Sequence, residues 1–327
     1  MGSNPPFAAT CTNFRITLLG QYYLPKNAIH AAKRANVPAK DVKHYRQRHL
    51  TCRLSNRYQL ASIAQNLLQN LPLGGYEMPT AKTVLITGAS SGIGAATAVA
   101  AAEAGYDVAI GWYRDRAGAE ATAAKVRALG QRAVLVHGDV SNEDDVEDMF
   151  DQLDGEFDEL GVLVNNAGFI DTAMRVEEMS VERLRRMFEV NAIGPFLCAK
   201  QAAIRMAWRY GGAGGVIINV SSIAARLGSA GQNVDYAASK GAVDVLTKGL
   251  GDEMAADRVR VVGVRPGVID TPIHGKAGQP ERVRNMSNSL PMQRAGTPRE
   301  VADAILFLMS DKASYITGTS IDISGAR

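Results

Sequence analysis

Tyr236 and Lys240 lie four residues apart in a segment of good helix formers. Positions i and i+4 share one face of a helix, so this spacing places an ammonium group near a phenol. The ammonium favours the phenolate and lowers a phenol pKa that is about 10 when unperturbed. A phenol tuned in this way gives or takes a proton near neutral pH, which is general acid–base chemistry.

A glycine-rich turn lies upstream of this pair. Its sequence is Thr87-Gly88-Ala89-Ser90-Ser91-Gly92-Ile93-Gly94. It follows the short apolar stretch 82–86 and precedes the Ala-rich stretch 95–104, which predicts a strand, a turn and a helix in that order. Glycine lets the backbone approach a pyrophosphate, and a helix N-terminus favours its negative charge. Together, the two features indicate hydride transfer between a nicotinamide and an alcohol or carbonyl.

Alternating elements must position these residues. The expected strands are 82–86, 108–112, 133–136, 160–164, 215–220, 259–264 and 320–323. The expected helices are 95–104, 118–129, 146–153, 181–209, 236–256 and 299–310, and Gly194-Pro195 suggests a distortion in the fourth. Short apolar strands that alternate with helices predict a parallel sheet covered on both faces. We therefore expect an α/β fold, with one doubly wound, Rossmann-like domain and a seven-stranded parallel sheet over residues 78–327.

Residues 1–77 differ from the rest in charge. They carry ten Lys or Arg against two acidic residues, a net charge of +8, whereas residues 78–327 carry 26 basic against 31 acidic residues, a net charge of −5. Apart from helically spaced apolar residues over 60–71, this basic extension shows no sustained period. Three interpretations stay open: a targeting segment, an accessory segment packed on the body, or a natural translation start at Met78, which we favour. Polyanion or membrane binding is a further alternative.

Cysteine usage and hydropathy bound the setting. Cys11, Cys52 and Cys198 fit no metal-ligand or CxxC spacing, and their odd number suggests reduced thiols. No apolar run approaches the roughly 18 residues of a membrane-spanning helix, and the first residues lack the apolar stretch of a secretory signal. We therefore expect a cytoplasmic protein with no bound metal and no membrane or nucleic-acid partner.

Further motifs follow the glycine turn in a fixed order. They are Asp139-Val140, Asn165-Asn166-Ala167-Gly168, Asn191, Ser221-Ser222, Tyr236-x-x-x-Lys240 and Pro266-Gly267. With these motifs, about three quarters of the chain resembles the short-chain dehydrogenase/reductases, which are NAD(P)-dependent enzymes of Rossmann-like fold. Within that family, the run 225–236 resembles a sugar-dehydrogenase-like subgroup. Residues 1–77 have no counterpart in the family pattern.

The resemblance implies a catalytic set of four residues. Tyr236 would be the general acid in reduction and the base in oxidation, and Lys240 would lower its pKa and bind the nicotinamide ribose. Ser222 would hydrogen-bond the substrate oxygen, and Asn191 would hold a water that links Lys240 to solvent. Ser221 competes with Ser222, because neighbouring side chains of a strand point to opposite sides, and the family motif selects Ser222.

The resemblance also implies a cofactor pocket. Its residues would be Gly88, Ser90, Ser91, Gly92, Ile93, Gly94, Arg114, Asp139, Val140, Asn165, Ala167, Gly168, Tyr236, Lys240, Pro266, Gly267, Ile269 and Thr271. The glycines would form the pyrophosphate turn, and Asp139 would accept the exocyclic amine of adenine. Ile269 and Thr271 would hold the nicotinamide carboxamide.

The end of the second strand bears on the choice between NADP and NAD. An acidic residue there binds the ribose 2′-hydroxyl and repels a 2′-phosphate. Trp112 stands at that place instead, and Arg114 could pair with a phosphate. We therefore expect NADP, with NAD as the alternative if Asp115 points inward.

The segment 272–293 is a long expected loop over the substrate. In it or next to it, Arg282, Arg284 and Arg294 suggest an anionic substrate, although a solvated loop face explains them equally well. For His274 we favour a solvated loop position over contact with the substrate. Cys198 and Met206 have a spacing typical of core packing.

The sequence thus predicts an NADP-preferring oxidoreductase that acts on a small secondary alcohol or carbonyl. An NADP-binding redox sensor without catalysis is the alternative, but it predicts damage to a catalytic set that is intact. The family resemblance also implies a homotetramer or homodimer that assembles through the helices of Asn191 and Tyr236 and through C-terminal segments.

Overall fold

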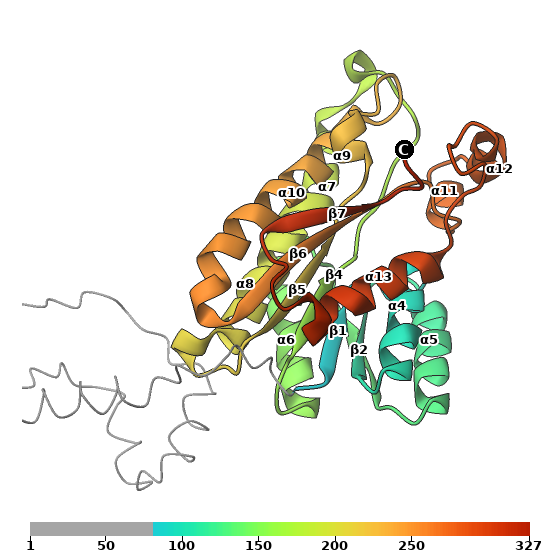
Figure 1. Ribbon diagram of the computed structural model, residues 1–327. Coiled ribbons are helices and arrows are strands. Elements are labelled where there is room, and N and C mark those ends of the chain that lie inside the picture. The colour runs from blue at the N-terminus through green and yellow to red at the C-terminus, as the bar shows by residue number, and fades with distance from the viewer. Residues whose placement is uncertain (1–80) are drawn as a thin grey trace, which may run out of the picture. The chain divides into compact units, whose positions relative to one another are not determined.

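Seven strands form one parallel sheet in the computed structural model, which describes residues 81–327 (Figure 1). The strands are β1 Thr83–Ile86, β2 Asp107–Trp112, β3 Ala133–His137, β4 Val162–Asn165, β5 Gly215–Val220, β6 Val259–Pro266 and β7 Thr319–Ile323. Their order in the sheet is β3-β2-β1-β4-β5-β6-β7, so the direction of winding reverses between β1 and β4. Ligands of open α/β sheets bind beyond the carboxyl ends of the strands at such a reversal. The predicted fold class and strand number are confirmed.

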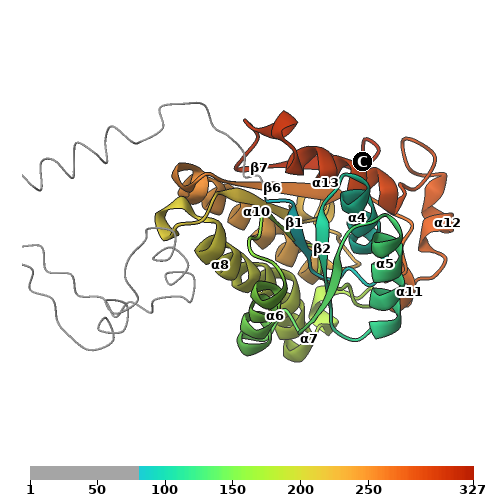
Figure 2. The same cartoon turned by 90° about the horizontal axis from the view of Figure 1, so that it is seen from below.

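Helices cover both faces of the sheet (Figure 2). The helices α4 Gly92–Glu103, α5 Arg116–Ala128 and α13 Pro298–Met309 lie on one face. The helices α6 Glu143–Glu156, α8 Gly194–Met206 and α10 Val234–Met254 lie on the other. Within β1, Val84 and Ile86 pack against the face covered by α4, α5 and α13, and Leu85 packs against the opposite face. All three side chains are fully buried. A strand buried on both faces needs a continuous apolar run rather than an alternating one, which explains the sequence of β1.

The expected helix 181–209 is interrupted in the structure. It consists of α7 Val181–Phe188, a π-helical turn over Glu189–Ile193 and α8, which ends at Met206. Proline at the second position of α8 lacks an amide hydrogen, so the regular hydrogen-bond ladder cannot continue through it. The expected distortion near Asn191 is therefore present, and π turns of this kind are frequent at functional sites.

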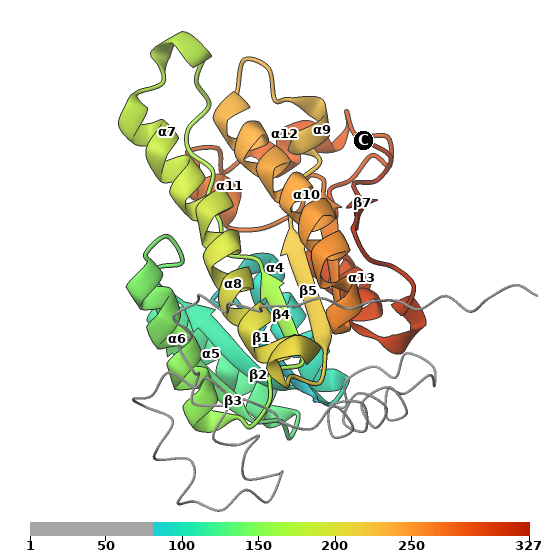
Figure 3. The ribbon, with the colours of Figure 1, turned by 90° about the vertical axis from the view of Figure 1, so that its left-hand side faces the viewer.

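Short helices gather beyond the carboxyl ends of β4, β5 and β6 (Figure 3). They are α9 Ala224–Leu227, α11 Ile273–Lys276 and α12 Arg282–Ser287, the last two within the expected loop 272–293. Among the described residues, no helix has the length and apolar character needed to cross a membrane. All expectations for residues 1–77 lie outside the described residues.

A buried ion pair ties this end of the molecule together. Arg183 of α7 donates from Nε to Oδ2 of Asp235 at 2.8 Å, and the two side chains are 7% and 0% exposed. Nη1 of Arg183 also donates to the carbonyl of Thr172 at 2.8 Å. Asp235 directly precedes Tyr236, so the pair fixes the start of α10 against α7 and the segment after β4.

We expect Arg183→Met to lower the free energy of unfolding by about 3–5 kcal/mol, because it leaves the buried Asp235 carboxylate without its cation. Urea unfolding followed by circular dichroism measures the change. Arg175→Met is the matched control, since Arg175 pairs with Glu177 at the exposed surface and its loss should matter little. Similar losses in the two variants would contradict the assignment.

Candidate active site

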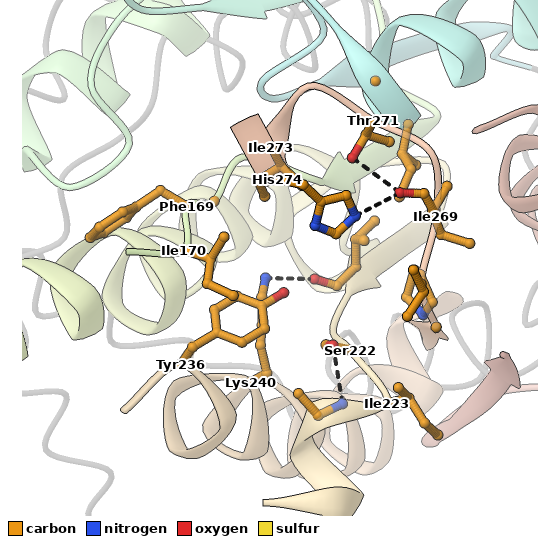
Figure 4. A pocket seen from close by; sticks show the side chains of 18 of the residues that line it. Phe169, Ile170, Ser222, Ile223, Tyr236, Lys240, Ile269, Thr271, Ile273 and His274 are labelled. Carbon is orange, nitrogen blue, oxygen red and sulfur yellow. Dashed lines mark hydrogen bonds between the residues drawn. The ribbon is translucent and has the colours of Figure 1, made fainter. Parts of the chain in front are cut away.

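A cavity of about 480 Å³ opens where the loops after β1, β4, β5 and β6 meet the start of α10 (Figure 4). Tyr236, Lys240 and Ser222 line it together with the glycine turn. Each strand delivers its following loop to the same edge, because all seven strands are parallel. Residues more than 100 positions apart in the sequence therefore share one pocket.

Lys240 is buried, with 4% of its surface exposed. Its Nζ lies 5.9 Å from the centre of the Tyr236 ring and donates to the carbonyl of Val220 at 2.9 Å. Burial lowers the pKa of Lys240 from 10.5 to about 8, because a cation is poorly solvated there. The side chain thus stands beside the phenol, as its helical spacing predicts, with its ammonium directed to the end of β5.

The expected lowering of the Tyr236 pKa is wrong for this structure. Burial raises the pKa of Tyr236, and a hydrogen bond with Ser222 and the charge of Arg282 oppose that rise. Spacing along α10 brings Lys240 to the correct face, but the path of its side chain takes the charge to the Val220 carbonyl. The groups that favour the phenolate come instead from the end of β5 and from α12.

The two neighbouring serines differ in environment. The Ser221 hydroxyl is buried and donates to the main-chain carbonyl of Lys240 at 3.0 Å. The Ser222 hydroxyl accepts from the amide of Ala224 at 3.1 Å and lies beside Tyr236 (Figure 4). Ser222 is therefore the serine whose side chain is available next to the phenol.

Asn191 lies in the π-helical turn and is fully buried. Its Oδ1 accepts from the amide of Phe169 at 2.9 Å, and its Nδ2 donates to the carbonyl of Phe169 at 2.8 Å. Nδ2 also approaches the Ser239 hydroxyl at 3.3 Å. The side chain thus holds the loop after β4 against α10.

The glycine turn fits tightly against the loop after β4. Gly88 has φ +64°, and a Cβ there would lie 2.9 Å from Cα of Ala167. A Cβ at Gly94 would lie 2.5 Å from Nδ2 of Asn166, which donates to the carbonyls of Thr87 and Gly88. Only glycine allows this backbone path, which leaves the turn free of side chains where a pyrophosphate would approach. The cradle therefore fits a dinucleotide.

Most predicted cofactor residues line the cavity, and five do not, namely Gly94, Arg114, Asp139, Val140 and Asn165. Those that do are Gly88, Ser90, Ser91, Gly92, Ile93, Ala167, Gly168, Tyr236, Lys240, Pro266, Gly267, Ile269 and Thr271. Asn165 is buried away from it, because its Nδ2 donates to Oδ1 of Asn219 and to the carbonyl of Pro195. Strand alternation directs the side chain of Asn165 into the core and leaves Asn166 to face the turn.

Gly94 lies in the first turn of α4, and the other three follow β2 and β3, where the sequence predicts the adenosine part of the cofactor. The Asp139 carboxylate accepts hydrogen bonds from Arg186 and Ser141, which lower its pKa against the effect of burial. Val140 packs against Gly194, where a Cβ would lie 3.0 Å from its Cγ2. Arg114 is exposed, with its guanidinium 5.1 Å from the centre of the Tyr113 ring.

Asp115 does not point inward as the alternative required. Its Oδ1 accepts from the amide of Gly118 at 2.9 Å and so caps the first turn of α5.

Several lining residues were missed or misjudged from the sequence. Phe169, Ile170 and Ile223 form apolar walls near Tyr236. His274 is half-buried and not solvated as we favoured, because its Nε2 hydrogen-bonds the carbonyl of Ile269 at 2.8 Å and burial lowers its pKa. Loop residues carry no periodic signal, so only their position after β4, β5 or β6 could have indicated them. The core positions of Cys198 and Met206 are confirmed.

Comparison with known proteins gives close matches over this region. A family model described as enoyl-(acyl carrier protein) reductase matches residues 88–325. An uncharacterized oxidoreductase of Escherichia coli K12, YgfF, is 47% identical over 74% of this chain and 98% of its own length. The cis-4-hydroxycyclohexanecarboxylate dehydrogenase of Sinomonas cyclohexanicum is 40% identical over 75% of this chain and 95% of its own length.

A solved structure agrees with the fold and the cofactor class. The 3-ketoacyl-(acyl-carrier-protein) reductase of Brucella melitensis, in complex with NADH, superposes with a TM-score of 0.69 at 33% identity, over 75% of this chain and 98% of that one. The fold, the glycine cradle and these matches over nearly the whole length of the relatives agree with one another. The chain belongs to the short-chain dehydrogenase/reductase family, and it is an oxidoreductase of a family that uses a nicotinamide cofactor.

Proposed function

We propose that this protein is an NADP(H)-preferring oxidoreductase that interconverts a secondary alcohol and the corresponding carbonyl compound. The observation that carries this proposal is the position of Tyr236, Ser222 and Lys240 in one cavity with the glycine turn. The cofactor, when bound, supplies or accepts the hydride. The chain's own residues then have to bind the substrate oxygen and move one proton.

Tyr236 is the proton donor to the substrate oxygen in reduction and the acceptor in oxidation. Burial raises its pKa, so the phenol is protonated and ready to donate at neutral pH. Ser222 donates a hydrogen bond to the substrate oxygen and stabilises the charge that develops on it. Its proximity to the Tyr236 hydroxyl places both donors where one oxygen atom can be reached.

Lys240 resupplies the proton and holds positive charge near the phenolate that forms. Its pKa of about 8 means that it exchanges protons close to neutral pH. Asn191 is a positioning residue, because its amide fixes the loop of Gly168 and Phe169 against the helix that carries Lys240. A Cβ at Gly168 would lie 3.4 Å from Nζ of Lys240, so this loop forms one wall of the lysine site.

The end of β2 supports a preference for NADP. Trp112 occupies the place of the acidic residue that would select NAD, and its buried Nε1 has no hydrogen-bond partner among the described residues. Asp115, the alternative carboxylate, caps α5. Arg114 is exposed beside this position and would pair with the 2′-phosphate. Asp139 and Val140 would border the adenine, and the main chain near Asn165 would line the ribose side.

The alternative of a redox sensor without catalysis receives less support, and the assembly is a separate question. The redox-sensor hypothesis requires a damaged catalytic set, whereas all four residues are present and three line one cavity. Assembly through α8 and α10 stays a prediction, although Phe196 and Val245 are 53% and 73% exposed on those helices.

Tyr236→Phe should lower kcat by at least about 100-fold, because only the transferable proton is lost. Fluorescence titration with NADPH should give nearly the same dissociation constant as for the unchanged protein. Tyr315→Phe is the control, since Tyr315 is fully exposed. Retained turnover in Tyr236→Phe would exclude the acid–base role.

Arg114→Ala should weaken NADPH binding by roughly three- to tenfold at low ionic strength and leave NADH binding almost unchanged. The exposed Arg116, which lies 3.9 Å from Glu120, provides the control Arg116→Ala. Fluorescence titration with both cofactors measures the ratio. Equal effects on NADPH and NADH would show that Arg114 does not contact the 2′-phosphate.

Lys240 should make stability depend on alkaline pH. Between about 8, its folded pKa, and its unfolded value of 10.5, the unfolded chain binds more protons, so stability should rise with pH by roughly 3 kcal/mol. Lys240→Met removes this titration and should flatten the rise, as urea unfolding at several pH values would measure. Lys248→Met, on the exposed face of α10, should keep the rise. An equal rise in Lys240→Met would contradict the assignment.

A further inference from the structure

The charged side chains that line the cavity all have one sign. Among its lining residues within 81–327, Lys240, Arg282 and Arg327 are cationic and none is Asp or Glu. The domain around it is acidic in sequence, with 31 acidic against 26 basic residues over 78–327. The cavity therefore concentrates positive charge on an otherwise acidic body, which favours an anionic ligand.

Arg282 lacks the carboxylate that its neighbours have. Its Nη1 donates to the neutral Oε1 of Gln279 at 2.7 Å, and no ion pair joins it to another described residue. By contrast, Arg284 pairs with Glu281 at 2.7 Å, and Arg294 pairs with Glu300 at 2.6 Å. Arg282 is also partly buried, and burial together with the charge of Arg327 lowers its pKa. A half-buried guanidinium without a counter-ion is stabilised by an anion brought from outside.

The guanidinium of Arg282 lies near the reacting groups. Its charge opposes the rise that burial causes in the pKa of Tyr236, and it adds to the fall that burial causes in the pKa of His274. The cavity also has apolar lining side chains, among them Phe169, Ile170, Ile223 and Ile273 (Figure 4). A ligand in this part of the cavity would thus meet a cation, an apolar surface and the proton donor together.

We propose that the substrate carries a carboxylate that Arg282 binds, while its apolar carbon frame packs on Phe169, Ile170 and Ile223. The substrate class is then a hydroxy acid and its oxo acid, with the reacting carbon held apart from the carboxylate by that frame. This inference rests on the proposed function. In reduction, the carbonyl carbon receives the hydride and the oxygen receives the Tyr236 proton, while NADPH is oxidised and the carboxylate is unchanged. Arg327 adds positive charge on the same side.

The guanidinium fork suits phosphate as well as carboxylate, so a cofactor phosphate or a phosphopantetheine thioester is the competing source of the anion. The carboxylate is favoured because Arg282 lies close enough for its charge to act on Tyr236 and His274, whereas the glycine turn would offer its own amides to a phosphate.

The test compares two ketones of similar shape, 4-oxocyclohexanecarboxylate and 4-methylcyclohexanone, in the whole protein with NADPH. We expect kcat/KM to favour the acid, and Arg282→Gln to lower the ratio of acid to neutral ketone by about 10- to 100-fold, mainly through KM. Arg284→Gln is the matched control, because Arg284 lies on the same helix, is exposed and is already paired. A ratio unchanged by Arg282→Gln overturns the proposal.

Two further measurements separate the alternatives. One measurement is the affinity for NADPH: if Arg282→Gln lowers it as much as it lowers the ratio of kcat/KM for the two ketones, the anion is a cofactor phosphate. The other is turnover of acetoacetyl-CoA, a phosphopantetheine thioester: if Arg282→Gln lowers kcat/KM for this substrate alone, the anion is a substrate phosphate. Either result overturns the proposal. If neither ketone is reduced, calorimetric titration of the NADP-loaded protein with cyclohexanecarboxylate decides. If cyclohexanecarboxylate binds and Arg282→Gln abolishes this binding, the carboxylate site is supported although the proposed function fails. If cyclohexanecarboxylate does not bind to the unchanged protein, the carboxylate site is overturned.

Discussion

The close approach of two loops at the point where the sheet reverses direction underlies the whole site. The Thr87 hydroxyl accepts from the amides of Asn166 and Ala167 at 3.0 and 2.9 Å. In return, the side-chain amide of Asn166 donates to the main-chain carbonyls of Thr87 and Gly88. This reciprocal set joins the turn after β1 to the loop after β4, and it leaves no room for a Cβ at Gly88 or Gly94. The cofactor cradle and one wall of the lysine site are thus a single rigid unit.

From this unit the arrangement extends through buried polar groups that cannot be left unpaired. Asn191 secures Phe169, Arg183 secures Asp235, and Lys240 donates to the last carbonyl of β5. These bonds connect the π-helical turn to the loop after β4, α7 to α10, and α10 to the end of β5. Breaking one of these bonds would leave a buried polar or charged group without a partner, which lowers the free energy of unfolding because the interior has a low dielectric constant. The site is therefore held by bonds whose loss the protein tolerates poorly.

Cationic side chains that form no ion pair with another described residue distinguish the part of the cavity around Tyr236. Burial lowers the pKa of both Lys240 and Arg282, so each retains its proton at a cost. Elsewhere in the described part of the chain, largely buried cations such as Arg183 and Arg205 have carboxylate partners. A bound cofactor and an anionic substrate would supply the missing negative charge in the reacting state. Binding and protonation would then be coupled, because an anion near Tyr236 raises the pKa of the phenol that has to donate.

Sequence alone was sufficient for whatever depends on local pattern. Continuous apolar runs such as 215–220 specify strands buried on both faces, and the glycine turn, Ser221-Ser222 and the Tyr236–Lys240 spacing indicate a dinucleotide oxidoreductase of known family. Tertiary structure decided which partners the polar and charged groups of the side chains contact. It turned Asn165 into the core, paired Asp139 with Arg186, used Asp115 as a cap, and bonded the Lys240 ammonium to the Val220 carbonyl. It also separated Arg282 from Arg284 and Arg294, three arginines that sequence could not tell apart. The reason is that periodicity fixes the face on which a residue lies, whereas burial, pairing and pKa depend on distant segments that only the folded chain brings together.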